Sequence, residues 1–406
     1  MKILIISYIY PPEVQGTGIM VRELSEALAA GGHQVTVQTG WPNHPQGKLY
    51  PGYKMKWRHM ERDGSHDVQR IAMMIANKSS NIKRLGVYSS FAASSFVNGL
   101  SLGRHDVVVS LSTPIIGVWT AWALARLWKA KYVNIIFDLW PEVILNAGRT
   151  KNNWLYNIIR NIDTLNCKCS DAISVLSQGM KDQVVARGIS PDGIEIIPTW
   201  IDTDRIKPMS NQNNWRRDNN IPPEKFIVLY SGTIGHVSGA EILIDTAQYL
   251  KEKKDILLLI VGDGVAKSEL QRLADENKTD NIRFMPFQPE ESLCQMQATA
   301  DVSLVTLLPK SGATSVPCKI LTYMAAGRPV IASVDLDCAT ARFVNGACCG
   351  LTCPAQDPKA LADCILDMYS RKEFRLECGI NARKCAEEQF SRHFVIKQYE
   401  KLICHE

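Results

Sequence analysis

Each half of this 406-residue chain opens with the same pattern, which is a short buried strand, a loop that contains glycines, and a helix. In the first half the loop reads P-P-E-V-Q-G-T-G and follows the predicted strand Ile3–Ser7. In the second half it reads S-G-T-I-G-H-V-S-G and follows the predicted strand Phe226–Tyr230. Rossmann-like domains begin in this way and bind their ligands at the carboxyl ends of the strands. The sequence therefore predicts an α/β protein with two doubly wound, Rossmann-like domains that face a cleft.

Runs of β-branched and apolar residues alternate with helical patterns in both halves, which is typical of parallel sheets covered on both faces. Since one hydrophobic core rarely extends beyond about 250–300 residues, the length also favours two domains. Residues 199–223 form the best boundary, because they contain three prolines and no apolar periodicity. The remaining predicted strands are 34–39, 67–71, 107–111, 132–137, 172–175 and 195–197 in the first half, and 256–261, 282–284, 302–305, 330–332 and 350–352 in the second.

Composition and charge narrow the class of protein. A net charge of +5 without a long Lys/Arg run does not indicate a nucleic-acid partner. The apolar run Met1–Tyr10 ends at two prolines without a small-residue cleavage site, so we interpret it as a strand rather than a signal peptide. Residues Val107–Ala125 carry no charge, but Pro114 divides them. We expect a strand, a turn and a helix there, and a membrane-spanning helix is the alternative. We expect a location in the reducing cytosol.

The two glycine loops are candidate phosphate-binding sites. Glycine lets a backbone approach a ligand closely, and the N–H groups at the start of a helix attract anions. The first loop contributes Gly16 and Gly18, ahead of a helix expected from about residue 19. The second contributes Gly232 and Gly235, with His236 as a further hydrogen-bond donor. A plain tight turn would produce either pattern.

Two further segments of the second half carry candidate donor-binding residues. Gly262 and Gly264 follow a predicted strand, where ligands bind in open parallel sheets, although Asp263 could instead cap the next helix. Lys319 lies near the start of a helix that ends at a glycine, and its charge suits a diphosphate. A solvated surface lysine is the alternative. Phe287, after the strand at 282–284, is also assigned to donor binding.

The segment I-I-F-D-L-W-P-E places acidic residues after a fully apolar strand of the first half. Asp138 follows that strand directly, and Glu142 lies about one turn further along the chain. The carboxyl end of a buried strand lies near the predicted ligand crevice, so Asp138 is a candidate catalytic residue. Asp138 could equally cap the following helix.

These segments together resemble glycosyltransferase family 4, which has the GT-B fold, and in particular its bacterial surface-polysaccharide branch with the N-acetylfucosamine and colanic-acid transferases. The resemblance covers nearly the whole chain and rests on the order of P-P-E-x-x-G-T-G, F-D-L-W-P-E, S-V-L-S-Q-G, I-I-P-T-W-I-D, Y-S-G-T-I-G, V-G-D-G, S-V-P-C-K and M-A-A-G-R-P-V. It implies an acceptor domain over 1–205, a donor domain over 206–388, and a last helix, 389–406, that packs back on the first domain.

The resemblance also implies a reaction. A hexosyl residue, including N-acetyl-amino or deoxy forms, would move with retention from a UDP-sugar to a polyprenyl-diphosphate-linked saccharide in O-antigen, capsule or exopolysaccharide synthesis. Lys319, His236 and the Gly232–Gly235 loop would neutralise the departing diphosphate. Asp138 would orient the acceptor or stabilise positive charge at the sugar. No cofactor and no catalytic metal are expected, and D-x-D occurs only as Asp335-Leu336-Asp337.

The chain departs from the family pattern at several positions. Many members carry two glutamates where Thr314 and Thr322 align here. Thr233 and Ser238 stand where many relatives have Arg and Lys, and Phe137 replaces a frequent histidine. Two alternative functions therefore stay open. The protein could be a sugar-nucleotide epimerase of the same fold, or a decayed transferase that only binds its ligand. Turnover of the donor with and without acceptor lipid would separate the three.

The lipid-linked acceptor implies contact with an anionic membrane surface. Residues Lys48–Arg62, K-L-Y-P-G-Y-K-M-K-W-R-H-M-E-R, mix cations with aromatic side chains in the way that interfacial segments do. We therefore expect a peripheral protein at the inner face of the bacterial plasma membrane. A solvated loop is the alternative interpretation of this segment.

Overall fold

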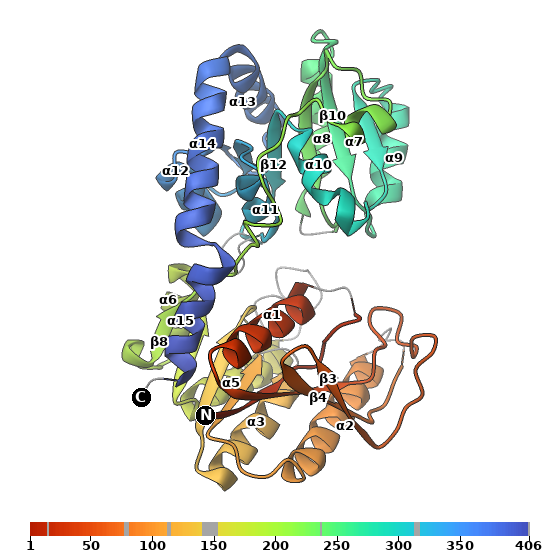
Figure 1. Cartoon of the computed structure of the whole chain (residues 1–406). Helices are drawn as coiled ribbons and strands as arrows, with labels where there is room; N and C mark the ends of the chain where they lie inside the picture. The colour runs from red at the N-terminus through yellow and green to blue at the C-terminus, as the bar shows by residue number, and fades with distance from the viewer. Residues whose placement is uncertain are drawn as a thin grey trace. The chain divides into compact units, whose positions relative to one another are not determined.

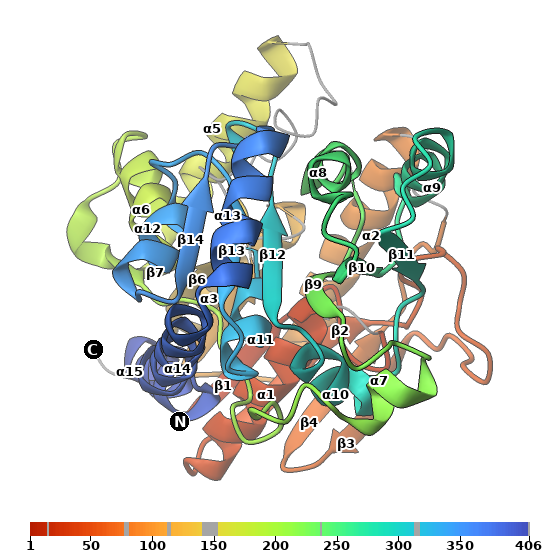
Figure 2. The same ribbon diagram turned by 90° about the horizontal axis from the view of Figure 1, so that it is seen from above.

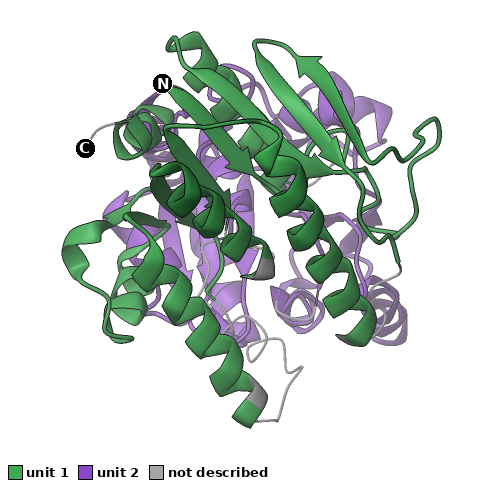
Figure 3. Cartoon of the chain, turned by 90° about the horizontal axis from the view of Figure 1, so that it is seen from below, with its two compact units in different colours: residues 1–144, 150–197, 396–406 green, residues 145–149, 198–395 purple. Residues whose placement is uncertain are grey.

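The computed structural model describes residues 1–13, 16–76, 81–111, 115–139, 153–235, 238–311 and 317–404, and Figure 1 shows the chain with its helices and strands labelled. The chain divides into two compact units, which Figure 3 colours separately. Unit 1 contains the described residues up to 197 together with 396–404, and unit 2 contains those from 198 to 395.

Unit 1 is built on an eight-stranded sheet in the order β3-β4-β2-β1-β5-β6-β7-β8. Neighbouring strands run parallel, except that β3 pairs antiparallel with β4 at one edge. Helix α3 packs between α2 and α5. The strands are β1 Lys2–Ile6, β2 Gln34–Gly40, β3 Arg58–Asp63, β4 His66–Ile71, β5 Val107–Leu111, β6 Lys131–Ile136, β7 Ala172–Val175 and β8 Ile194–Ile196. The helices are α1 Gly16–Ala30, α2 Asn81–Leu100, α3 Ile115–Trp128, α5 Asn153–Cys169 and α6 Gln178–Val185, with a 3-10 turn, η1, at Pro191–Gly193.

Unit 2 is built on a wholly parallel six-stranded sheet in the order β11-β10-β9-β12-β13-β14. Helix α13 lies against β13 and β14, as Figure 2 shows. The strands are β9 Phe226–Ser231, β10 Ile256–Val261, β11 Ile282–Met285, β12 Val302–Thr306, β13 Val330–Ser333 and β14 Gly350–Cys353. The helices are α7 Asn214–Asp218, α8 Ile242–Leu250, α9 Lys267–Glu276, α10 Leu293–Ala298, α11 Lys319–Ala325, α12 Ala339–Gly346, α13 Pro358–Ser370 and α14 Lys372–Gln389, with a 3-10 turn, η3, at Glu290–Ser292.

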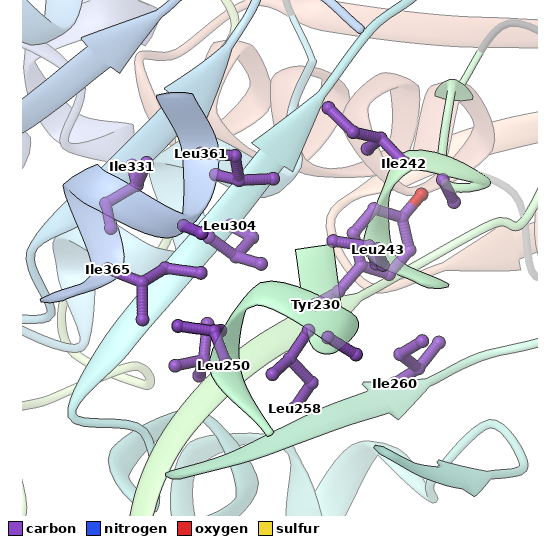
Figure 4. Packing of buried hydrophobic residues seen from close by; sticks show 14 of the residues in the cluster. Tyr230, Ile242, Leu243, Leu250, Leu258, Ile260, Leu304, Ile331, Leu361 and Ile365 are labelled. Carbon is purple, nitrogen blue, oxygen red and sulfur yellow. The ribbon is translucent and has the colours of Figure 1, made fainter. Parts of the chain in front are cut away.

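The central strands of both sheets are buried on both faces. Every residue of β5, β9 and β10 is buried, which explains why these strands appear in the sequence as continuous apolar runs rather than alternating ones. In unit 2 one face of the sheet packs against helices α8 and α13 (Figure 4). The residues labelled there are Tyr230, Ile242, Leu243, Leu250, Leu258, Ile260, Leu304, Ile331, Leu361 and Ile365.

The predicted α/β class and the two Rossmann-like units are confirmed, with one correction to the sheets. Each predicted strand is present, but β3 was not predicted, and its antiparallel pairing makes the first sheet mixed rather than parallel. The sequence of β3, R-H-M-E-R-D, contains no β-branched residue, and its side chains alternate between exposed and half-buried. An edge strand of this kind lacks the apolar signal on which the prediction depended.

The uncharged run at 107–125 contains the strand β5 and most of α3, so the interpretation as a strand and a helix is confirmed. No helix in the described part of the chain is long and apolar enough to cross a bilayer.

Helix α15, Arg392–Cys404, begins in unit 2 and continues in unit 1 from Ile396. Its buried Tyr399 packs into unit 1, where its hydroxyl donates to the Ile197 carbonyl at 3.3 Å and accepts from Ser174 Oγ at 3.4 Å. The Lys131 ammonium adds a hydrogen bond to the Leu402 carbonyl at 2.9 Å. The amphipathic pattern at the end of the sequence therefore corresponds to a helix whose residues Val395, Ile396, Tyr399 and Ile403 are buried.

Candidate functional site

Two glycine turns lie side by side at the carboxyl ends of β9 and β10. The N–H of Gly232 donates to the Val261 carbonyl at 2.9 Å, and the N–H of Ile234 donates to the Asp263 carbonyl at 2.9 Å. The N–H of Ala266 returns a bond to the Ile234 carbonyl at 3.1 Å. The two turns therefore form one hydrogen-bonded unit at the edge of the sheet where parallel α/β proteins bind ligands.

Close packing between the two turns explains why glycine is required at positions 262 and 264. A Cβ on Gly262 would lie 1.9 Å from the Gly232 carbonyl oxygen, and one on Gly264 would lie 2.3 Å from the Ile234 oxygen. Both residues also have positive φ, +156° and +154°, which favours glycine. Gly262 and Gly264 thus hold the neighbouring turn in place. A direct contact with the donor stays a prediction.

The expected alternative for Asp263, a cap on the next helix, is wrong. Helix α9 starts after Ala266 and has no side-chain cap. Asp263 Oδ1 instead accepts from the N–H of Gly264 at 2.7 Å, within the turn.

The first turn offers main-chain donors for an anion. Within the described ranges, neither the Thr233 N–H nor the Gly235 N–H makes a hydrogen bond, whereas those of Gly232 and Ile234 do. Gly232 has φ +127°, a conformation that side chains other than hydrogen rarely allow. Successive N–H groups in a tight turn form a concave site that suits phosphate oxygens.

Lys319, the first residue of α11, lies beside this turn. Its ammonium lies 3.7 Å from the centre of the Tyr230 ring, and its Cδ lies 3.8 Å from where a Cβ on Gly232 would be. No carboxylate among the described residues forms an ion pair with it. Burial lowers the pKa of Lys319 to about 7, because the charged ammonium has lost its hydration. The side chain is half-buried and packs on the Tyr230 ring, which favours the binding role over a solvated surface lysine.

The start of α11 differs from the expected anion site in one respect. The N–H of Ile320 already donates to the Pro317 carbonyl at 3.1 Å, and the N–H of Leu321 to the Cys318 carbonyl at 3.1 Å. These two N–H groups are occupied within the chain, and the group that α11 places beside the glycine turn is the Lys319 ammonium.

Asp138 lies in unit 1, two residues beyond the end of β6. Burial raises the pKa of its carboxyl group. A carboxyl group with a raised pKa at a strand end is suited to proton transfer or to a contact with a substrate hydroxyl. The alternative role as a helix cap concerns residues outside the described ranges.

The structure describes only some of the remaining residues singled out in the sequence. His236, Glu142 and Thr314 lie outside the described residues. Phe287, 57% exposed, lies two residues beyond β11 and is open to a ligand.

Gly16 and Gly18 lie within the first turn of α1 rather than in the loop before it, which corrects the expected helix start. A Cβ on Gly18 would lie 3.3 Å from Tyr10 Cα, so this glycine allows α1 to pack closely on the loop that follows β1. A Cβ on Gly16 would meet nothing within 4 Å.

A buried polar network of unit 1 was not predicted. Glu13 Oε1 accepts from the N–H groups of Asn43 at 2.8 Å and His44 at 2.7 Å, and so joins the loops that follow β1 and β2. Burial raises the pKa of Glu13, and these N–H bonds oppose the rise. Arg70 on β4 donates to the Pro11 carbonyl at 2.7 Å. The P-P-E motif is thus a structural anchor at the carboxyl edge of the first sheet.

The basic and aromatic segment at 48–62 is only partly a loop. Its end forms β3, and Arg62 is bound to Asp67 at 2.8 Å, so that cation is already paired. Residues 54–58, K-M-K-W-R, are exposed in succession, and Trp57 is 59% exposed.

In the described part of the chain, no cluster of three or more His, Cys, Asp or Glu side chains has a geometry that could hold a metal ion. Asp335 of the D-x-D sequence accepts from the N–H of Lys310 at 2.5 Å.

Comparison with known proteins gives consistent matches over both units. The model of the family described as "Glycosyl transferase 4-like domain" matches residues 15–200, and that of "Glycosyl transferases group 1" matches residues 211–385. The putative colanic acid biosynthesis glycosyl transferase WcaI of Escherichia coli is 27% identical over 342 residues, which cover 82% of this chain and 84% of WcaI.

Two solved structures are similar over almost their whole length. Sucrose-phosphate synthase from Thermosynechococcus elongatus has a TM-score of 0.75 at 21% identity and covers 99% of this chain and 98% of its own. Anabaena HepE, solved in complex with UDP, has a TM-score of 0.72 at 14% identity, with 99% of each chain covered.

Proposed function

The chain belongs to glycosyltransferase family 4 and has the GT-B fold of that family, and on this premise we propose that it uses a UDP-sugar as donor. We propose that it transfers a hexosyl residue, with retention of configuration, to a polyprenyl-diphosphate-linked saccharide. The product would be part of a bacterial surface polysaccharide. The similarity to WcaI, which is named for colanic acid biosynthesis, supports this direction.

The observation that carries the proposal is the half-buried ammonium of Lys319, which lies beside the glycine turn and has no acidic partner among the described residues. A desolvated cation without an acidic partner in the described chain is costly to the folded protein, and a bound anion would neutralise it. The N–H groups of Thr233 and Gly235, which have no hydrogen-bond partner among the described residues, lie in the adjoining turn. A diphosphate supplies both the charge for Lys319 and the acceptor oxygens for the turn.

In this reaction the bond between the anomeric carbon and the diphosphate oxygen breaks as the acceptor oxygen bonds to that carbon. Negative charge then develops on the diphosphate, and the protonated Lys319 and the turn N–H groups would stabilise it more strongly than in the bound donor. The departing phosphate oxygen can accept the proton of the acceptor hydroxyl, so a protein nucleophile is not required. Asp138 would hold the acceptor hydroxyl, and His236 would contribute a further donor to the diphosphate.

A lipid-linked acceptor requires the enzyme to work at a membrane surface. We propose that it lies at the inner face of the plasma membrane, bound peripherally through the exposed part of the basic and aromatic segment. Each cation near an anionic surface contributes about 1 kcal/mol, and an exposed tryptophan favours the interface. The residues are Lys48, Lys54, Lys56, Trp57 and Arg58.

The test is donor turnover with purified protein and UDP-hexoses, with and without a polyprenyl-diphosphate saccharide. A transferase releases UDP only when the acceptor is present, and the saccharide gains one residue of unchanged anomeric configuration. Release of UDP without acceptor would indicate a sugar-nucleotide epimerase. UDP binding without turnover under either condition would indicate a decayed, ligand-binding protein.

A further inference from the structure

Tyr323 is a fully buried residue of α11, four residues after Lys319. Its hydroxyl accepts a hydrogen bond from the main-chain N–H of Ser231 at 2.9 Å and donates one to the Ser231 carbonyl at 3.0 Å. The Ser231 hydroxyl also donates to it at 3.3 Å. The Tyr323 hydroxyl therefore makes three hydrogen bonds with Ser231 alone, one as donor and two as acceptor.

The place of Ser231 in the sheet explains why the hydroxyl is needed. Ser231 is the last residue of β9, and on one side it pairs with Val261 of β10. On the other side β12 pairs with β9 only at Val228 and Leu229, so the ladder ends before Ser231. The Tyr323 hydroxyl supplies the missing donor and acceptor, because buried main-chain groups must be hydrogen-bonded.

A second side chain holds Ser231 from a different helix. Gln297 of α10 donates from Nε2 to Ser231 Oγ at 2.8 Å, and both residues are buried. Ser231 is therefore fixed through its main chain by α11 and through its side chain by α10. The glycine turn begins at the next residue, Gly232.

Helix α11 thus contacts the end of β9 at two consecutive residues. Lys319 lies over the ring of Tyr230, and Tyr323 is bonded to Ser231. We propose that Tyr323 is a positioning residue for the donor, which fixes the Lys319 ammonium relative to the N–H groups of the 232–235 turn so that both bind one diphosphate. This inference rests on the proposed function, because it concerns the same diphosphate site. Misplacement of one group by about 1 Å is enough to weaken a site that depends on several groups at once.

The test is the substitution Tyr323→Phe, which removes one oxygen and keeps the ring in the core. UDP affinity, measured by titration calorimetry, should fall about tenfold, because the Ser231 main chain loses its partner and the turn can move away from Lys319. The matched control is Tyr399→Phe in unit 1, since Tyr399 is equally buried and its hydroxyl also bonds to a serine and a carbonyl. That control should lose stability and keep the parent affinity for UDP.

A double-mutant cycle with Lys319→Ala separates positioning from general damage. If Tyr323 acts through Lys319, adding Tyr323→Phe to Lys319→Ala should weaken UDP binding by less than twofold beyond the single change. Additive losses would overturn the inference. So would an unchanged UDP affinity in Tyr323→Phe.

The pH dependence of UDP binding is a readout that a purely structural role would leave unaltered. In Tyr323→Phe a loosened turn should admit water to the ammonium, so the midpoint of the pH profile should move upward from about pH 7. An unaltered midpoint contradicts the positioning role. If Tyr323→Phe does not fold, Gln297→Leu loosens Ser231 from the other side, and an unchanged affinity there also overturns the inference.

Failure of the positioning role and failure of the proposed function give different results. If the parent does not bind UDP, or if Lys319→Ala binds it as tightly as the parent, the diphosphate site itself is wrong. If Lys319→Ala is weakened and Tyr323→Phe is not, the site stands and only the role of Tyr323 is lost.

Discussion

Replacing Lys319 with methionine should weaken UDP binding and stabilise the folded protein at the same time. Burial lowers the pKa of Lys319 from 10.5 to about 7, which corresponds to a cost of about 5 kcal/mol for the charged form. The contact with the Tyr230 ring, at 3.7 Å, recovers about 2 kcal/mol at most. Desolvation is therefore the larger effect, and methionine fills a similar volume without a charge.

The predicted gain depends on pH in a defined direction. Below about pH 7 the lysine is charged in both the folded and the unfolded chain, and the folded state bears the whole cost. Between pH 7 and 10.5 the unfolded chain binds the extra proton, so the stability contributed by this group rises with pH. The difference between Lys319→Met and the parent should therefore be largest below pH 7 and should shrink towards pH 10.5.

Urea unfolding at pH 6 and pH 9 measures this difference. Side-chain movement and water penetration relieve part of the cost, so we expect Lys319→Met to be more stable by about 1–4 kcal/mol at pH 6. The matched control is Lys181→Met on α6, because the Lys181 ammonium donates to the Ile194 carbonyl at 2.7 Å. That control should lose stability. A destabilised Lys319→Met protein at pH 6 would refute the reasoning.

The second measurement is the affinity for UDP as a function of pH. UDP should bind the protonated form of Lys319, so the affinity of the parent should fall up to tenfold for each pH unit above about 7. The second pKa of a phosphate is about 6, so the charge of UDP itself changes little in this range. Calorimetry in two buffers of different ionisation enthalpy should show proton uptake on binding. Lys319→Met should bind at least tenfold more weakly at pH 6, with no proton uptake and a flat profile.

Three further outcomes test other parts of the structure. Activity should survive EDTA, and loss that manganese or magnesium restores would make Asp335 and Asp337 the residues to study. Gly262→Ala should destabilise unit 2 by about 2–4 kcal/mol and weaken UDP binding, because the new Cβ would lie 1.9 Å from the Gly232 oxygen; an unchanged melting temperature would contradict the packing argument. The protein should bind anionic vesicles less strongly as salt rises from low to physiological concentration. A variant in which serine replaces Lys48, Lys54, Lys56 and Arg58 should lose vesicle binding and keep its UDP affinity. If this variant floats with vesicles as well as the parent does, the segment is only a solvated loop.

The fold was predictable because its signals are local. Strands such as β5 and β10 are mainly apolar runs, and β9 with its glycine turn marks the first strand of the second sheet directly in the sequence. Strand β3 was missed because an exposed antiparallel edge strand needs neither apolar nor β-branched residues. The start of α1 was placed too late, because Gly16 and Gly18 resembled a loop, whereas both lie in the first helical turn and Gly18 allows close packing there.

The sequence predicted only those site residues whose chemistry is evident from the residue type and its neighbours in the chain. Lys319 was identified because a lysine in an apolar, glycine-marked turn is unusual, but its place over the Tyr230 ring brings together residues 89 positions apart in the chain. Tyr323 and Gln297 carry no sequence signal at all, since an apolar helix that contains a tyrosine is usually ordinary core. Their roles arise because β12 no longer pairs with β9 at Ser231, and sheet register of that kind is set by packing over the whole domain. The residues that bear the charge can thus be found in the sequence, whereas those that hold it in place appear only in the folded chain.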